Sequence, residues 1–270
     1  MSYAILQVDV APTADQLKRA VKSLKTLTEA DAVKMAVEAR GILLKNLSLE
    51  DSAALQRALQ SEGVPTEMIE ANQLPKLPDA KFVRRMELRP EALLVYDPVG
   101  RAVPLPWQQI ALLSAGAVRH FDLSQTRREE TVRTYDPVRG FHAKSVTDVR
   151  HKVEDDVRLL LDIFVAGGAM RFQMEADTFP FKYCFDRPDL NLPQKLGLLI
   201  ELFAQNAPQA IMNHGANALR QGAPGNAAYA SKAALFDEST WLLWRMSRKE
   251  HGPGGLPASS ARDNKPPALP

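Results

Sequence analysis

Among the side chains of this sequence, the histidines are the best suited to metal binding or to acid–base catalysis near neutral pH. No two of them fall in an HxH, HxxxH or HExxH spacing, the patterns that place neighbouring groups on one metal ion. The sequence therefore predicts no metal site. The alternative is a site assembled from distant histidines, because three of them flank or lie within one charged segment. The histidines are His120, His142, His151, His214 and His251.

The candidate nucleophile is the single cysteine, Cys184, in the stretch TFPFKYCFDRP. Its aromatic neighbours favour a buried thiol over a catalytic thiolate, which needs an electropositive and partly exposed position. The chain has no GxSxG, P-loop or GxGxxG motif. We therefore expect no enzyme and no cofactor. An enzyme would require distant groups, such as Asp97 and His120, to converge on one pocket.

Two kinds of surface residue are candidates for binding. Lys18, Lys22 and Lys25 are spaced by about one helical turn, so they fall on one side of a helix. Trp241 and Trp244 lie near the end of the structured chain, and tryptophan is enriched at interaction hot spots. We take these five residues as the candidate interaction surface. The alternatives are a solvated basic face and tryptophans that tie a terminal helix to its own chain.

A second basic cluster could contact a phosphate or an acidic partner. It consists of Arg84 and Arg85 with Lys81 and Arg89 nearby. The net charge of the whole chain is only +2, so there is no global attraction to a polyanion. We expect no nucleic-acid partner.

Length and composition indicate an ordinary globular protein. The 270 residues suffice for two domains, and 45% of them are hydrophobic and 24% charged. We find no basic segment ahead of an apolar run at the N-terminus and no apolar stretch of about 18 residues, which a membrane span requires. With one cysteine, these features predict a cytoplasmic protein without a signal peptide or transmembrane segment.

Local patterns predict the elements of residues 1–74. Apolar, β-branched runs at 3–10, 41–48 and 64–71 are typical of strands. Helices are expected after Thr13, Thr28 and Ser48, each of which can serve as an N-cap. The expected order is β-α-α-β-α-β.

This order, with the stretches AVKSLKTLTEADAVKMAVEA and SLEDSAALQRALQSEGVPTEMI, resembles the C-terminal domain of the bacterial ribosomal stalk protein. The resemblance covers about residues 3–71 and implies that domain's fold. In that family a basic, glycine-containing helix pair contacts translation factors, and Lys18, Lys22 and Lys25 lie in the corresponding region. The family's Gly-Leu-Gly turn is Thr26-Leu27-Thr28 here, so factor binding does not carry over.

The remainder of the chain is expected to form a second domain. Prolines mark residues 75–90 as a linker with one short strand. Residues 91–248 read as a barrel-like β domain with covering helices and a long loop insertion at 122–156. The Pro/Gly-rich stretch 249–270 predicts a disordered tail. Residues 80–206 weakly resemble a bacterial pleckstrin-homology-like barrel, through Asp97 with Gly100 and the segment PWQQI.

Together these features predict an α+β protein that resembles bacterial proteins. We expect an interaction or scaffold module that binds a protein partner or a second copy of itself. The alternative is an anion-binding module that recognises a lipid headgroup or a nucleic-acid phosphate with a basic helix face or with the barrel. Salt dependence distinguishes the two, because contacts to phosphate weaken steeply as salt rises.

Overall fold

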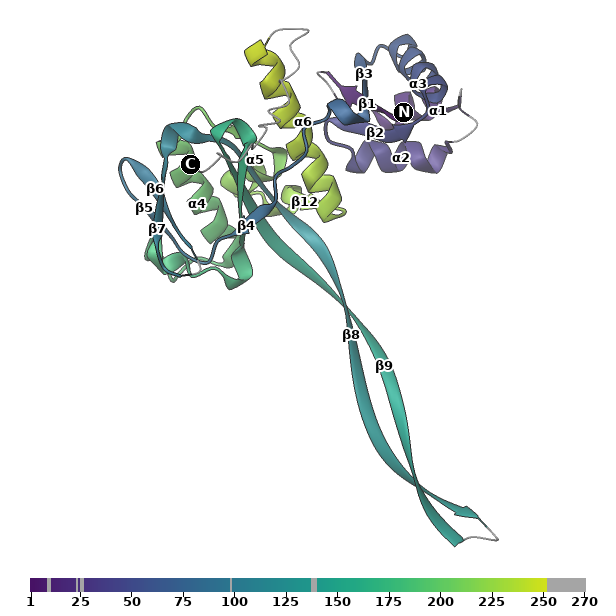
Figure 1. Cartoon of the computed structure of the whole chain (residues 1–270). Helices are drawn as coiled ribbons and strands as arrows, with labels where there is room; N and C mark the ends of the chain where they lie inside the picture. The colour runs from purple at the N-terminus through teal and green to yellow at the C-terminus, as the bar shows by residue number, and fades with distance from the viewer. Residues whose placement is uncertain (9–10, 23, 25–26, 98, 137–139, 252–270) are drawn as a thin grey trace, which may run out of the picture.

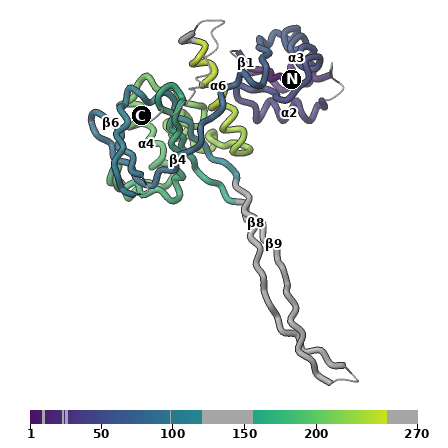
Figure 2. The backbone as a smooth tube through the Cα atoms, in the orientation of Figure 1, coloured from purple at the N-terminus to yellow at the C-terminus, as the bar shows by residue number. Residues whose placement is uncertain are grey.

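A computed structural model describes residues 1–8, 11–22, 24, 27–97, 99–136 and 140–251, with side chains described outside 120–155 and 249–251. Figure 1 shows a small N-terminal domain beside a larger domain, with helix α6 between them. Figure 2 follows the backbone from the N-terminal domain into the larger one near β4. The fold class is α+β, as the sequence predicts.

The N-terminal domain has the expected β-α-α-β-α-β order. Its three strands form an antiparallel sheet in the order β2-β1-β3. The side chains of Thr13, Thr28 and Ser48 each accept a hydrogen bond from the backbone N–H three residues ahead, which fixes where the helices begin. The elements are β1 (Tyr3–Gln7), α1 (Ala14–Val21), α2 (Glu29–Glu38), β2 (Ile42–Leu47), α3 (Leu49–Ser61) and β3 (Thr66–Glu70).

The two faces of this small sheet have different partners. Ile5 and Leu43 pack with Leu17, Leu55 and Leu59 of the helices and form the core of the domain. The other face carries a second buried set, which packs against the larger domain. That set consists of Ala4, Leu6, Ile42 and Ile69.

The range 75–90 differs from the expected linker with one strand. It contains β4 (Ala80–Phe82) and β5 (Met86–Leu88), and both pair with strands of the larger domain. Prolines flank these two strands but do not lie within them. Each strand therefore keeps three residues whose N–H groups can donate, which is enough for a short pairing. The larger domain therefore begins at about residue 80 rather than 91.

A three-stranded antiparallel sheet in the order β5-β6-β7 opens the larger domain. β6 (Ala92–Tyr96) and β7 (Ala102–Pro106) are joined by a turn in which the Asp97 carboxylate accepts hydrogen bonds from the N–H groups of Val99 and Arg101. β7 contains Pro104 and Pro106 and lies at the edge of the sheet, as expected for strands with proline.

The main sheet has six strands, in the order β11-β8-β9-β10-β4, with β12 paired to β8. β4, β11 and β12 each pair in parallel with a neighbour from which several other elements of the chain separate them. The described strands therefore form open sheets, and the expected antiparallel barrel is not present among them. The strands are β8 (Ile110–Asp136), β9 (Gly140–Val165), β10 (Met170–Glu175), β11 (Ile211–Met212) and β12 (Ala228–Tyr229).

The expectation of a loop at 122–156 was wrong for the backbone. β8 runs to Asp136 and β9 starts at Gly140, and the two are paired up to those residues (Figure 1). The segment is charged, but it is also rich in β-branched residues such as Val132, Val146 and Val149, which favour strands. The connection, 137–139, lies outside the described residues.

Helices cover both faces of the main sheet. On one face Leu196, Leu199 and Phe203 of α4 pack on residues of β8 and β9, such as Leu113 and Ile163. On the opposite face α6 packs on β8 and against the N-terminal sheet (Figure 1). No described helix is long and apolar enough to cross a membrane. The helices are α4 (Leu192–Asn206), α5 (His214–Arg220) and α6 (Lys232–His251).

Short helical turns complete the chain, and one of them, at Gly167-Gly168, connects β9 to β10. The predicted tail, 249–270, falls mostly outside the described residues, and α6 continues to His251. The turns are η1 (Ala71–Gln73), η2 (Trp107–Gln109), η3 (Ala166–Gly168), η4 (Ala176–Thr178), η5 (Phe181–Tyr183) and η6 (Pro224–Ala227).

Candidate functional site

Trp241 lies at the joint between the two domains. Its side chain is 9% exposed, and its indole N–H donates a 3.0 Å hydrogen bond to the carbonyl oxygen of Gln7 in β1. The indole ring packs on Gly41, which has φ +85°. A Cβ at Gly41 would lie 2.1 Å from Cδ2 of Trp241, so only glycine permits this approach.

Ion pairs surround this contact. Lys45 of β2 contacts Asp237 of α6 at 2.5 Å, and Arg248 of α6 pairs with Glu67 of β3. Trp244 is half-buried beneath Arg248, whose guanidinium carbon is 5.0 Å from the centroid of the indole. Both tryptophans of the predicted surface therefore pack within the chain, where they help to hold α6 against the N-terminal domain.

The predicted lysine surface lies on the helical side of the N-terminal domain, away from Trp241. Acidic side chains partly neutralise its positive charges. Lys18 Nζ is 3.9 Å from a carboxylate oxygen of Asp15, and Lys22 Nζ is 3.4 Å from Glu29. Lys25 lies outside the described residues. Exposed pairs of this kind contribute little to stability, but they lower the positive potential that a phosphate would meet.

The second basic cluster surrounds one carboxylate. Glu87 accepts hydrogen bonds from Arg85 at 2.6 Å, Arg89 at 2.7 Å and the Tyr96 hydroxyl at 2.8 Å. The guanidinium of Arg85 lies between two rings, 4.2 Å from the centroid of Tyr96 and 4.5 Å from that of Tyr183. The hydrogen bond from Arg85 lowers the pKa of Glu87. Glu87 offsets only one of the two guanidinium charges that it contacts, so the cluster keeps a net positive charge, but these hydrogen bonds hold Arg85 and Arg89 within the fold.

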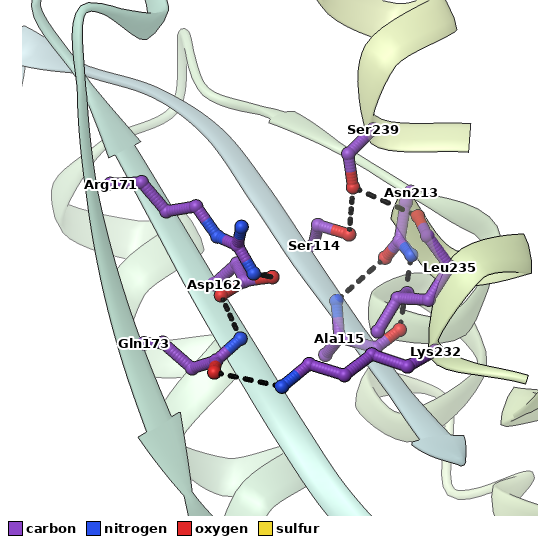
Figure 3. A network of polar contacts seen from close by, with 9 residues as sticks. All are labelled: Ser114, Ala115, Asp162, Arg171, Gln173, Asn213, Lys232, Leu235 and Ser239. Carbon is purple, nitrogen blue, oxygen red and sulfur yellow. Dashed lines mark hydrogen bonds and ion pairs between the residues drawn. The ribbon is translucent and has the colours of Figure 1, made fainter. Parts of the chain in front are cut away.

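A buried ionic network lies between the main sheet and α6 (Figure 3). Asp162 of β9 is fully buried and accepts hydrogen bonds from Arg171 at 3.0 Å and Gln173 at 2.8 Å, both on β10. Lys232, at the start of α6, donates to Gln173 at 3.2 Å. Burial raises the pKa of the Asp162 carboxyl, and the Arg171 guanidinium acts in the opposite direction. Because all these groups are paired with one another, the network orients α6 and offers little to a substrate.

Two further polar contacts fix α6 and α5 to the same sheet (Figure 3). The hydroxyls of Ser114 and Ser239 are 2.7 Å apart, and Ser239 also donates to the carbonyl of Leu235. The Asn213 amide bonds both the N–H and the carbonyl of Ala115, at 2.9 and 3.0 Å. Buried polar groups with full hydrogen bonding of this kind specify one packing arrangement.

A cleft of about 570 Å³ opens beside this joint. Val37 of α2 and Arg40, which follows the helix, form one wall. The larger domain supplies His214, Asn226 and Glu238, and Trp241 also lines the cleft. Its volume and its position between two domains are typical of ligand sites.

Glu238 lines the cleft, and the buried Tyr229 supports it from behind. The Glu238 carboxylate accepts the Tyr229 hydroxyl at 2.5 Å and the backbone N–H of His214 at 2.8 Å. Burial and the nearby Glu238 charge raise the pKa of Tyr229. The guanidinium carbon of Arg40 lies 5.1 Å from the centroid of the Tyr229 ring. This arrangement can recognise a ligand by charge and hydrogen bonding, and it holds no group positioned as a nucleophile.

The other residues considered for chemistry are separate from this cleft or undescribed. The Asp97 carboxylate binds its own turn and the Arg101 guanidinium. The Cys184 thiol is half-buried, donates to the carbonyl of Met86 at 3.5 Å, and has its pKa raised to about 12 by burial. The side chains of His120, His142, His151 and His251 lie outside the described residues. Within the described part of the chain, no three His, Cys, Asp or Glu residues could hold a metal ion together.

Sequence reasoning did not find Arg40, Tyr229 or Glu238, because each belongs to a different element and no local spacing connects them. The buried Asp162 did leave a signal. It interrupts the otherwise apolar run LLLDIFV, and a charge inside a buried strand implies a paired partner nearby.

Comparisons of this chain with protein-family models, with curated proteins and with solved structures found no match. What the protein does is therefore inferred from its own residues.

Proposed function

We propose that this protein is a non-enzymatic interaction module, and that the outer part of β8 and β9 is the element that contacts a protein partner. We call this part the ribbon: residues 119–136 of β8 and 140–157 of β9. The observation that carries the proposal is the pairing pattern. β8 and β9 pair with each other from Arg119 and Val157 out to Asp136 and Gly140.

No third described strand pairs with the ribbon. β12 pairs with β8 only up to Val118, and β10 pairs with β9 only as far as Leu160. A two-stranded hairpin without a further strand or a packed face is at best marginally stable in water. Each of its outer edges also presents backbone N–H and C=O groups that another strand can bind. A partner that adds a strand supplies what the ribbon lacks.

The base of the ribbon is firmly anchored. Leu112 of β8 and Phe164 of β9 are fully buried and pack beneath α6 with the N-terminal sheet. The network around Asp162 holds the same part of β9 to β10. A contact element rooted in a packed, two-domain body can hold a partner at a defined position, which is what a scaffold requires.

Charge favours a protein partner over a polyanion. Within residues 119–157 the lysines and arginines together equal the aspartates and glutamates in number. Nucleic acids and anionic membranes select elements with a positive excess. At the base of the ribbon Val157 is 55% exposed although it is apolar, and Asp156 lies 3.7 Å from Arg158. A mixed surface with an exposed apolar residue is typical of protein–protein contacts.

The test is a variant with a shortened ribbon. Phe121 and Asp155 are directly opposite in the ladder, so residues 122–154 can be replaced by a two-residue Asn-Gly turn that closes the strands. The matched control is the double substitution Lys18→Gln, Lys22→Gln, which leaves the ribbon intact. Each variant and the wild type are used to isolate partners from the cells that make the protein, and a captured protein is then reconstituted from purified components.

We expect the shortened variant to fold and melt like the wild type and to lose the reconstituted partner, while the lysine variant retains it. Binding should change less than tenfold between about 50 and 200 mM salt, because few phosphate contacts are involved. Retention of the partner by the shortened variant would contradict the proposal. A steep loss with salt that the lysine variant abolishes would favour an anion-binding module instead.

A further inference from the structure

We propose that the cleft between the two domains is a binding site for a small monocarboxylate with an apolar body, and that Arg40 is its anchor. The inference is independent of the ribbon, because it rests on residues of α2 and the turn after it, and of α5, α6 and β12. The cleft has a volume of about 570 Å³, which falls within the range of small-molecule sites.

Arg40 provides the positive charge. Among the described residues no carboxylate lies within ion-pairing distance of its guanidinium, although most described arginines have such a partner. Its planar group lies near the Tyr229 ring, with 5.1 Å between the guanidinium carbon and the ring centroid. An arginine held by an aromatic ring still has its N–H donors available in one plane, and this geometry matches the two oxygens of a carboxylate.

The platform beneath Arg40 is fixed before any ligand arrives. The Tyr229 hydroxyl donates to Glu238 and accepts from the Asn213 amide at 2.9 Å and from the N–H of Gly215 at 3.1 Å. Tyr229 and Glu238 are only 4% and 5% exposed. A preformed wall lowers the entropic cost of ordering the site on binding.

The buried Glu238 carboxylate limits the charge of the ligand. It lies in the same cleft as the single guanidinium of Arg40, so the two charges cancel and every negative charge on a ligand is repelled by Glu238. A ligand with one negative charge placed against Arg40 meets less of this repulsion than a dianion. His214 is exposed at the rim and Asn226 offers an amide for a further hydrogen bond. Val37 and Trp241 supply apolar surface for the body of the ligand. A monocarboxylate fits this combination better than a phosphate monoester.

The experiment uses benzoate as the probe in NMR titrations of the full-length protein. Benzamide has the same shape without the charge, and phenyl phosphate carries a second charge. Arg40→Gln removes the anchor, and Arg40→Lys keeps the charge but not the planar fork. The matched control is Lys34→Gln, because Lys34 lies in α2 just before Arg40, pairs with Glu38 and does not line the cleft. It lines a neighbouring groove of about 320 Å³, which Arg40 also borders.

We expect benzoate to bind with a Kd of about 5 mM or tighter and benzamide at least tenfold more weakly. Arg40→Gln should weaken benzoate about tenfold to hundredfold, Arg40→Lys should have a smaller effect, and Lys34→Gln should have none. Unchanged melting of each variant shows that it is folded. Equal binding of benzoate and benzamide, full binding by Arg40→Gln, or no benzoate binding at about 10 mM would overturn the proposal. Tighter binding of phenyl phosphate would overturn the assignment to monocarboxylates.

Discussion

Replacement of Trp241 by alanine tests whether α6 fastens the two domains together. A buried aromatic side chain removes about 150–250 Å² from water. At about 25 cal/mol per Å², this burial is worth about 4–6 kcal/mol. Measured substitutions of buried phenylalanine or tryptophan by alanine cost about 3–5 kcal/mol. Trp241 is 9% exposed and loses a hydrogen bond to Gln7 as well, so we expect a decrease of about 3–5 kcal/mol in the free energy of unfolding.

The assay is urea denaturation, with light scattering after size exclusion to measure the oligomeric state. Trp244→Ala is the matched control, because its half-buried ring should cost only about 1–2 kcal/mol. Both variants should keep the oligomeric state of the wild type. A loss of less than about 1 kcal/mol in Trp241→Ala would refute the reasoning. So would a wild-type dimer that the double variant Trp241→Ala, Trp244→Ala converts to a stable monomer, because the tryptophans would then lie at an interface between subunits.

Other substitutions test the same packing from different sides. Gly41→Ala combines a left-handed φ with a clash against the indole of Trp241, so it should cost about 2–4 kcal/mol in urea denaturation, and a change below 0.5 kcal/mol would mean that the ring lies elsewhere. Arg171→Met leaves the Asp162 carboxyl buried without its cation, which should cost about 3–5 kcal/mol near pH 7. Burial raises the pKa of Asp162, so the folded state binds its proton more tightly than the unfolded state; the cost should be smaller at pH 5 than at pH 8, and the opposite trend would contradict this reading. Cys184 has a pKa raised from 9.0 to about 12, so its thiolate at pH 8 should be about 1000-fold scarcer, and alkylation by iodoacetamide should be slow until the protein is denatured. Rapid alkylation of the native protein would show that the thiol is exposed.

The N-terminal domain could be predicted from the sequence because its signals are local. Thr13, Thr28 and Ser48 cap their helices within three residues, and the apolar periods are uninterrupted. The helix caps and the apolar periods all favour the same elements, so the element order can be predicted without knowledge of tertiary contacts.

The larger domain could not be predicted in the same way. β11 and β12 contain two residues each, and they become strands only because α5 and the preceding chain bring them beside β8. The charged residues of 122–156 favoured a loop prediction, because the pairing of the two backbones leaves no signal in local composition. Such pairings depend on residues far apart in the chain.

The residues of the cleft were hidden for a similar reason. Arg40 and Tyr229 are separated by most of the chain and meet only because α6 docks the N-terminal sheet on the larger domain. The tryptophans were recognised as functional candidates, but the sequence could not show that Trp241 faces Gly41 rather than a partner. Glycine is common just after a helix because it ends the helix in a left-handed conformation. The sequence therefore contains no sign that Gly41 also contacts the indole of Trp241.

Hydrogen exchange of the reconstituted complex tests the central claim most directly. The backbone amides of β8 and β9 in the ribbon are compared in the free protein and in the complex, with α1 and α2 as internal references. The proposal predicts slower exchange within residues 119–136 or 140–157 on binding and no change in α1. Slower exchange confined to the face of α1, with the ribbon unchanged, would contradict it.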